Sequence, residues 1–168
     1  MNLSIREADL TDATDCEGIV DVLNSYAADP IGGGIPLSAE VRARLPLALL
    51  EHPTTFVLLA RVEGQSIGVA VCFWGVSTFH AHPLLNIHDL AVTPKWRGKG
   101  VGTALLDAIE TRALERRCCK LTLEVQDDNR RARALYDRCG FGDAVVGSAR
   151  PTRFLCKLLP IRGSTWRE

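Results

Sequence analysis

The stretch that decides the fold is residues 93–102, which read Thr-Pro-Lys-Trp-Arg-Gly-Lys-Gly-Val-Gly. Three glycines alternate at its end, immediately before a segment whose apolar residues recur at helical spacing. Glycine lets main-chain N–H groups approach a ligand that side chains would obstruct, and the unpaired N–H groups of a helix start favour an anion. The stretch therefore predicts a cradle for a phosphate or pyrophosphate, to which Arg97 and Lys99 add positive charge.

Two other phosphate-binding loops fit the spacing of this stretch less well. A P-loop requires Ser or Thr directly after its lysine, whereas Lys99 is followed by Gly100. A dinucleotide-binding fingerprint requires G-x-G-x-x-G, but Thr103 stands where the third glycine belongs, and a Thr-Pro turn follows the preceding strand. That second interpretation stays open as an alternative, in which Glu124 could imitate the ribose-binding acid.

Outward from the stretch, the chain alternates segments of strand and helix character. After it, we expect a helix over 98–117, a strand over 120–126 whose apolar residues up to Val125 point inward, and a helix over 130–139 that ends at Gly140. Before it, the expected strands lie over 3–6, 56–62, 67–76 and 87–92, and the expected helices start after Thr11 or Asp12 and after Ser38. A last strand is expected over 154–158.

This order predicts an α/β fold with a mixed central sheet flanked by helices. The first half of the sheet should be antiparallel, and the later strand-helix-strand unit should be parallel. Residues 29–36 hold three glycines between two prolines and are expected to form a loop. Pro46 lies inside the second helix and should kink or split it.

The composition is that of one compact soluble unit. With 168 residues, 46% of them hydrophobic and 24% charged, we expect a single domain over 1–168, with its core at about 3–159. Twenty basic and 20 acidic residues give a net charge of +0, which does not suit a dedicated nucleic-acid binder. The apolar runs are short and the start lacks the features of a secretory signal, so we expect no membrane partner and a cytoplasmic location.

The six cysteines are scattered and form no C-x-x-C, so reduced and mostly buried thiols are expected. The vicinal pair Cys118 and Cys119 leaves a redox or metal role open. His80 and His82 have no neighbouring ligand at a recognised metal spacing, and we predict no metal site.

Motifs on both sides of the glycines resemble those of the GNAT superfamily of N-acetyltransferases. The family signature is Arg or Gln, two residues, Gly, one residue, then Gly or Ala, and residues 97–102 match it. Residues 86–92 (NIHDLAV) and 121–125 (LTLEV) resemble its flanking strands, and residues 129–141 match its N-x-x-A-x-x-L-Y-x-x-x-G-F segment. Residues 73–79 with 88–90 are similar to the diamine acetyltransferase branch, although His88 replaces the Glu of that branch's Glu-Asp pair.

The resemblance implies acetyl-CoA as co-substrate, held in a V-shaped gap between the strand ending near Val92 and the strand starting at Lys120. The pyrophosphate would lie on the N–H groups of residues 98–102, and the pantetheine arm would pair with the main chain of Leu90 and Val92. The cofactor-binding residues implied in this way are Leu90, Ala91, Val92, Arg97, Gly98, Lys99, Gly100, Val101, Gly102, Asn129, Ala132 and Tyr136.

Acetyl transfer needs an unprotonated amine, a donor to the developing oxyanion and a proton for the departing thiolate. The main-chain N–H of Leu90 is the oxyanion candidate, and Tyr136 stands at the family's position for the acid, although it could also simply pack on an amphipathic helix face. The base is either Asp89 or His88, whose side chains strand alternation sends to opposite faces. Asp89 could instead only hydrogen-bond a nearby loop.

The resemblance thus implies an acyltransferase that moves the acetyl group of acetyl-CoA to a primary amine. The zero net charge favours a small amine over a long basic protein tail, with Asp29, Glu40 and Asp89 as local negative charges. We expect acceptor recognition on residues 32–34, the second helix and residues 77–83. A protein N-terminus or lysine as acceptor, and a sensor that binds acetyl-CoA without transfer, stay open as alternatives. Family habit implies a homodimer.

Overall fold

The computed structural model describes residues 2–143 and 155. The strands are β1 (Leu3–Glu7), β2 (Thr55–Val62), β3 (Gln65–Ser77), β4 (His82–Val92) and β5 (Leu121–Leu123). The α-helices are α1 (Ala13–Ala27), α2 (Ala39–Glu51), α3 (Val101–Glu115) and α4 (Arg130–Arg138), and two single-turn 3-10 helices are η1 (Pro30–Gly32) and η2 (Pro94–Trp96). The α/β class is confirmed.

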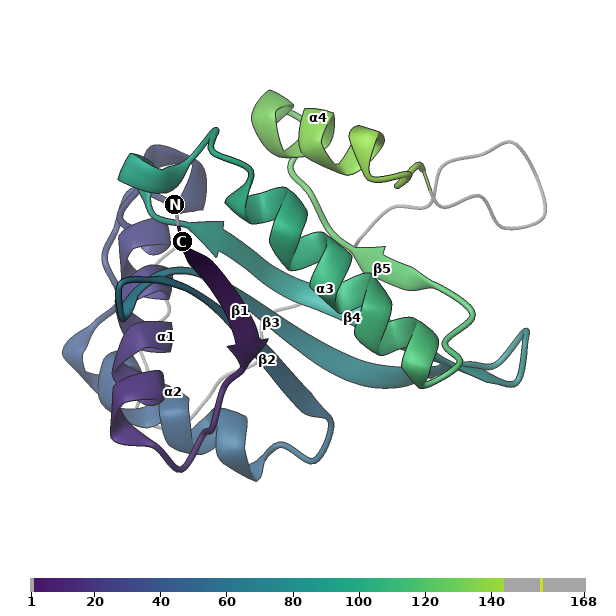
Figure 1. The fold of residues 1–168 in the computed structure, drawn as a ribbon, viewed down its shortest axis with the longest axis horizontal. Helices are drawn as coiled ribbons and strands as arrows, with labels where there is room; N and C mark the ends of the chain where they lie inside the picture. Colours follow the sequence, from purple (N-terminus) through teal and green to yellow (C-terminus); the bar gives the residue numbers. More distant parts are fainter. Residues whose placement is uncertain (1, 144–154, 156–168) are drawn as a thin grey trace.

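The strands form one sheet in the order β1-β2-β3-β4-β5. The first four pair antiparallel, and β4 pairs parallel with β5, as the sequence predicts for a mixed sheet. Helix α3 lies on one face of the sheet, and α1 and α2 lie on the other (Figure 1). This arrangement places the connection between β4 and α3, which contains the glycine stretch, at one end of the sheet.

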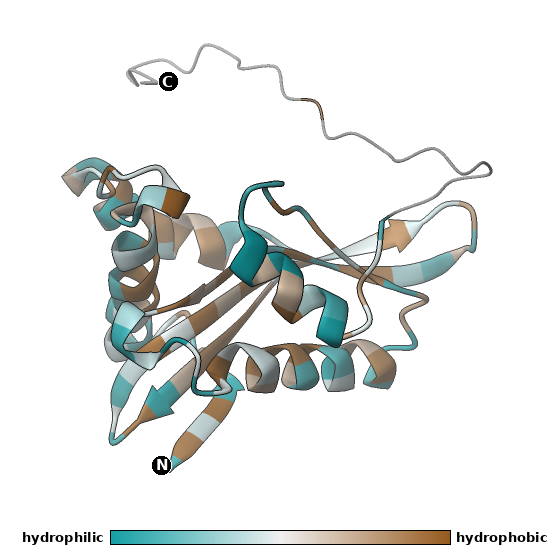
Figure 2. Cartoon of the chain, turned by 90° about the horizontal axis from the view of Figure 1, so that it is seen from above, coloured by the Kyte–Doolittle hydropathy of each residue, from teal (hydrophilic) through white to brown (hydrophobic). Residues whose placement is uncertain are grey.

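Both faces of the sheet are apolar, because alternate residues of the central strands serve different layers. One cluster, here called the α3 cluster, joins Leu58, Cys72 and Ile87 to Leu105 and Ile109 of α3. A second cluster, here called the α1 cluster, joins other residues of the same strands to α1 and α2; among its members are Ile19, Val22, Leu49, Leu59, Val69 and Val71. Figure 2 shows the strands carrying most of the hydrophobic colour between helices of mixed character.

A β-bulge in β4 changes which face its residues serve. Val71 pairs with Asp89, but the next residue of β3, Cys72, pairs with Ile87, so His88 is an extra residue on the bulged strand. Ile87 therefore belongs to the α3 cluster, whereas Ala91, four residues later, belongs to the α1 cluster. Without the bulge, strand alternation would place both on one face.

Strands β4 and β5 pair over a short length only. The register joins Leu85 to Leu121 and Ile87 to Leu123, where β5 ends, while β4 continues to Val92. The last residues of β4 therefore have no partner on the β5 side within the described part of the chain. This parting of the two strands opens the sheet beside the glycine stretch.

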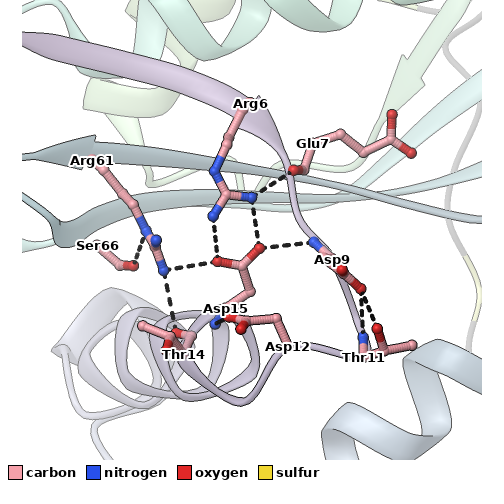
Figure 3. Close-up of polar contacts among 9 residues, drawn as sticks. All are labelled: Arg6, Glu7, Asp9, Thr11, Asp12, Thr14, Asp15, Arg61 and Ser66. Carbon is pink, nitrogen blue, oxygen red and sulfur yellow. Dashed lines mark hydrogen bonds and ion pairs between the residues drawn. The ribbon is translucent and has the colours of Figure 1, made fainter.

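A buried carboxylate fastens α1 to the sheet (Figure 3). Asp15, whose side chain is fully buried, accepts two hydrogen bonds from Arg6 of β1, at 2.7 and 2.6 Å, and one from the Asp9 main-chain N–H at 2.8 Å. Arg61 of β2 lies 2.9 Å from the same carboxylate. Helix α1 approaches closely here, since a Cβ at Gly18 would collide with Ser66 Oγ.

Two proline-bearing segments differ from expectation. Residues 29–36 are not wholly irregular, because Asp29 accepts a hydrogen bond from the Ile31 N–H and caps the single turn η1. Helix α2 runs unbroken through Pro46, and Leu45 and Leu49 pack against the α1 cluster. That packing outweighs the one main-chain hydrogen bond that proline removes.

Two strand boundaries are also corrected. The strand predicted over 87–92 begins at His82, so the loop expected over 77–83 is a hairpin turn with only residues 78–81 outside β3 and β4. The strand predicted over 120–126 is limited to Leu121–Leu123, and Val125 is exposed because no further strand pairs with it among the described residues. The strand expected over 154–158, and Cys156, lie outside the described residues. In the described part of the chain, no helix has the length and apolar character that crossing a bilayer requires.

Candidate functional site

A pocket of about 290 Å³ lies where β4 and β5 part. It is bounded by the end of β4, the glycine stretch, the start of α3, the face of α4 and the segment that joins α1 to η1. Most of the predicted cofactor-binding residues line it, namely Leu90, Ala91, Val92, Arg97, Gly98, Gly100, Gly102, Asn129, Ala132 and Tyr136. The sequence had not marked Tyr26, Ile31, Trp96, Thr103, Arg131, Leu135 and Arg138 as site residues, although all of them line this pocket.

The glycine stretch has the backbone that an anion cradle needs. Gly98 and Gly100 have φ of +74° and +83°, a region that residues with a Cβ rarely adopt. Gly100 is the N-cap of α3 and offers no side-chain cap, so the first N–H groups of the helix are left for another acceptor. A Cβ at Gly100 would meet no atom within 4 Å, which leaves the approach to these N–H groups open.

Gly102 has a different role, set by packing. A Cβ there would lie 3.0 Å from Leu135 Cδ2 of α4, so glycine lets α4 lie close to the start of α3. Helix α4 itself is capped by Asn129, whose Oδ1 accepts a hydrogen bond from the Ala132 N–H at 3.1 Å. Within the described part of the chain, the side-chain N–H groups of Asn129 donate to no protein acceptor, so they can bind a ligand.

The first pocket is rich in arginine. Arg97, Arg131 and Arg138 line it together with Asp29, which among the described residues is its one acidic lining residue. Arg97 donates from Nη1 to Asp29 Oδ2 at 2.6 Å and from Nε to the Val92 carbonyl at 2.8 Å. The Arg97 hydrogen bond lowers the pKa of Asp29, which therefore stays ionised and is not a free charge for an acceptor.

Two predicted cofactor-binding residues do not line the pocket with their side chains. Lys99 Nζ lies over the Trp96 ring, 4.8 Å from its centroid. The Val101 side chain is 1% exposed and belongs to the core under α3. The cause is helix geometry: the first residue of α3 turns its side chain inward, so only its main chain is left for a ligand.

A second pocket, of about 310 Å³, shares Tyr26, Leu90, Asn129, Ala132 and Tyr136 with the first. Its charged lining residues are acidic, Asp89 of β4 and Glu124 beyond β5, with His88 beside them; among the described residues no lysine or arginine lines it. Burial raises the pKa of Asp89, and the neighbouring His88 opposes part of that shift. The two pockets therefore differ in electrostatic character.

His88 and Asp89 lie on the same face of the sheet, contrary to the prediction from alternation. Asp89 pairs with Val71, which belongs to the α1 cluster. The His88 ring lies 5.5 Å from that of Phe73, which packs against the same cluster. The bulge at His88 is the cause, and it lets both side chains line the second pocket.

Two tyrosines from different helices line the pockets. Tyr136, on α4, packs edge to face on Phe141 with ring centroids 5.8 Å apart, and burial raises its pKa to about 12. Tyr26, in the last turn of α1, lines both pockets, and burial followed by the charges of Asp89 and Asp29 raises its pKa. No local sequence motif marks Tyr26, whose spacing from Ile19, Val22 and Leu23 is that of an apolar helix face.

The three regions expected to recognise an acceptor do not line these pockets. Residues 32–34, helix α2 and residues 77–83 line neither pocket, whereas Asp29 and Ile31, just before the first region, line the first one. Glu40 lies on the exposed side of α2, 3.2 Å from Arg44, and also lines neither.

Comparison with known proteins finds similarity to acetyltransferases. The sequence model of the acetyltransferase (GNAT) family matches residues 20–141. An uncharacterized N-acetyltransferase, YhfO of Bacillus subtilis (strain 168), is 30% identical over 145 residues, which cover 83% of this chain and 89% of that protein.

Similar solved structures extend over most of the chain. A ribosomal-protein-alanine N-acetyltransferase from Brucella melitensis biovar Abortus 2308 has a TM-score of 0.69 at 24% identity and covers 90% of this chain and 99% of its own. An aminoglycoside acetyltransferase from an uncultured soil metagenomic sample, in complex with sisomicin, has a TM-score of 0.71 at 18% identity and covers 90% of this chain and 97% of its own. At these identities the likeness concerns the fold.

Proposed function

This chain belongs to the acetyltransferase (GNAT) family, and from that premise we propose that it transfers the acetyl group of acetyl-CoA to the primary amine of a small molecule, by direct attack in a ternary complex. The observation that carries the proposal is the pair of adjoining pockets with opposite character. The first is lined by arginines and by an open helix start, and the second by carboxylates. Such a pair suits an anionic cofactor beside a cationic acceptor.

The residues of the first pocket fit acetyl-CoA, which supplies the acetyl group when bound. The open N–H groups at Gly100 and the start of α3 would hold the pyrophosphate, and Arg131 and Arg138 would add charge to the same end. The main chain of Leu90 and Val92 has no β5 partner and can pair with the pantetheine amides as an added strand would. Asn129 and Ala132 would flank that arm.

In the second pocket, Asp89 would take the proton from the ammonium group of the acceptor. Its raised pKa brings it closer to that of a useful base at neutral pH, while its carboxylate favours a bound cation. His88 is the alternative base, acting through water from the same face. The Leu90 N–H, next in the chain, would donate to the oxyanion that develops during attack.

Tyr136 would give a proton to the thiolate as it leaves. The acceptor nitrogen loses its second proton to solvent as the amide forms, and solvent reprotonates the Tyr136 phenolate. With its pKa raised to about 12, the phenol is protonated at neutral pH and can act as a donor. It lines both pockets, so the same hydroxyl can serve a reaction that takes place where they meet.

A competition assay tests the proposal. The protein is given acetyl-CoA with small amines, including amino acids, polyamines and amino-bearing antibiotics, and with unstructured peptides bearing lysines or a free N-terminus. We expect release of free CoA thiol to depend on a small amine. Far higher kcat/KM on peptides would contradict the small-molecule acceptor, and cofactor binding without transfer to any amine would favour a sensor.

Three further expectations stay proposals. They are a single domain over 1–168, a homodimer and a cytoplasmic location. The described cysteines Cys16, Cys72, Cys118, Cys119 and Cys139 are free thiols, which supports a reducing compartment. Sedimentation analysis of the full chain tests the dimer.

A further inference from the structure

The chain has two tyrosines, and both line both pockets. Tyr136 comes from α4, which also supplies Ala132 to the second pocket. Tyr26 comes from α1, and among the described residues it is the one lining residue of the second pocket that precedes β4 in the chain. Tyr26 is therefore a lining residue of the second pocket that lies outside the sequence motifs around the glycine stretch.

A series of hydrogen bonds fixes the end of α1 against the end of β4. The Asp29 N–H donates to the Tyr26 carbonyl at 3.0 Å, and Asp29 Oδ2 accepts from Arg97 Nη1 at 2.6 Å. Arg97 Nε in turn donates to the Val92 carbonyl at 2.8 Å. Gly32 closes the turn over Tyr26, because a Cβ there would collide with the Tyr26 carbonyl oxygen. Tyr26 is thus held in place across the pocket from β4.

The chemistry of the Tyr26 hydroxyl suits recognition of an amine. Burial and the nearby carboxylates of Asp89 and Asp29 all favour its neutral form. A neutral phenol can accept a hydrogen bond from an amine N–H while it donates to a carboxylate. Within the described part of the chain, the hydroxyl makes no hydrogen bond to protein, so both capacities are available to a ligand.

We infer that Tyr26 is an acceptor-binding residue, whose hydroxyl binds the amine of the substrate beside Asp89 of β4. The inference rests on the proposed function, because it concerns the acceptor of that reaction. It assigns a different task to each tyrosine: Tyr26 binds the acceptor, and Tyr136 serves the departing thiolate.

The test compares Tyr26→Phe with Tyr136→Phe, two variants that each remove one hydroxyl from the same pockets and keep the ring. With the best amine of the panel, we expect Tyr26→Phe to raise the KM for the amine by about tenfold, and to change the dissociation constant for acetyl-CoA by less than about twofold. Tyr136→Phe should instead lower kcat. Calorimetric titration of the amine into the CoA complex gives the same contrast at equilibrium.

The results for Tyr26→Phe and for the wild type distinguish failure of this inference from failure of the proposed function. An unchanged amine KM and affinity in Tyr26→Phe, or a loss confined to kcat, overturns this inference and leaves the proposed function standing. If the wild type neither binds nor acetylates any amine of the panel, the proposed function fails first, and the inference falls with it.

Discussion

Replacing Asp15 with asparagine should destabilise the protein by about 3 kcal/mol. The substitution keeps the volume of the side chain but removes the charge that faces Arg6 and Arg61. Removing one partner of a buried ion pair costs about 3 to 5 kcal/mol, because the other charge stays buried. The Arg61 side chain is 15% exposed, so its charge stays buried without a carboxylate partner. The Arg6 side chain is 48% exposed and can be hydrated instead, so the lower end of that free-energy range applies. For a chain of this size, 3 kcal/mol lowers Tm by roughly 6 to 12 °C.

Urea and thermal unfolding of Asp15→Asn measure this loss, with Asp21→Asn as the matched control on the same helix. Asp21 is 73% exposed and 3.9 Å from Arg42, so its loss should change the free energy of unfolding by no more than about 0.5 kcal/mol. Equal stability of the two variants would refute the reasoning.

The pH dependence of that difference gives a second check. The Arg6 hydrogen bond lowers the pKa of Asp15 below its ordinary 3.8. A lowered carboxylate pKa stabilises the fold fully above the unfolded value and loses that effect as the pH falls through the folded value. The gap between wild type and Asp15→Asn should therefore be constant near neutrality and close in acid below about pH 3.8. A gap that widens in acid would contradict the assignment.

Three further predictions concern the site. Gly100→Asp should abolish acetyl-CoA binding in a folded protein, because the new carboxylate lies in the open space beside the helix start, where the pyrophosphate would bind. Calorimetric titration measures the binding. Gly64→Asp, at φ of +81° in the β2–β3 turn, is the control with the same backbone strain and should bind acetyl-CoA normally. Tyr136→Phe should lower kcat by ~10²-fold or more with little change in acetyl-CoA affinity, and a normal kcat with only a shifted Tm would mean that the ring merely packs. Wild-type kcat/KM should fall as the pH decreases through the raised pKa of Asp89, because only the carboxylate accepts a proton. Asp89→Asn should remove this fall at low pH and most of the activity. An unchanged pH profile of kcat/KM in Asp89→Asn would favour His88 as the base.

The sequence determined the parts of this protein that depend on short-range pattern. The glycine spacing at 98–102 predicts the open backbone before α3, because positive φ and an uncapped helix terminus are local properties. The helix expected over 98–117 begins only at Val101, because Gly98 and Gly100 have left-handed backbones. Helix α4, with its cap at Asn129 and the left-handed Gly140 that follows its C-cap Cys139, is likewise readable from neighbouring residues. The order of strands and helices follows from periodicities of two and 3.6 residues.

The tertiary structure decided which side chains meet. Alternation alone sends His88 and Asp89 to opposite faces, and only the register of β4 against β3 reveals the bulge that brings them together. Tyr26 reaches the pockets because Asp29 pairs with Arg97, 68 residues away in the chain. Asp15 is buried for a similar reason, since Arg6 and Arg61 meet it from two strands. Contacts of this kind depend on strand register and on how closely helices approach the sheet, and neither quantity is encoded in the spacing of adjacent residues.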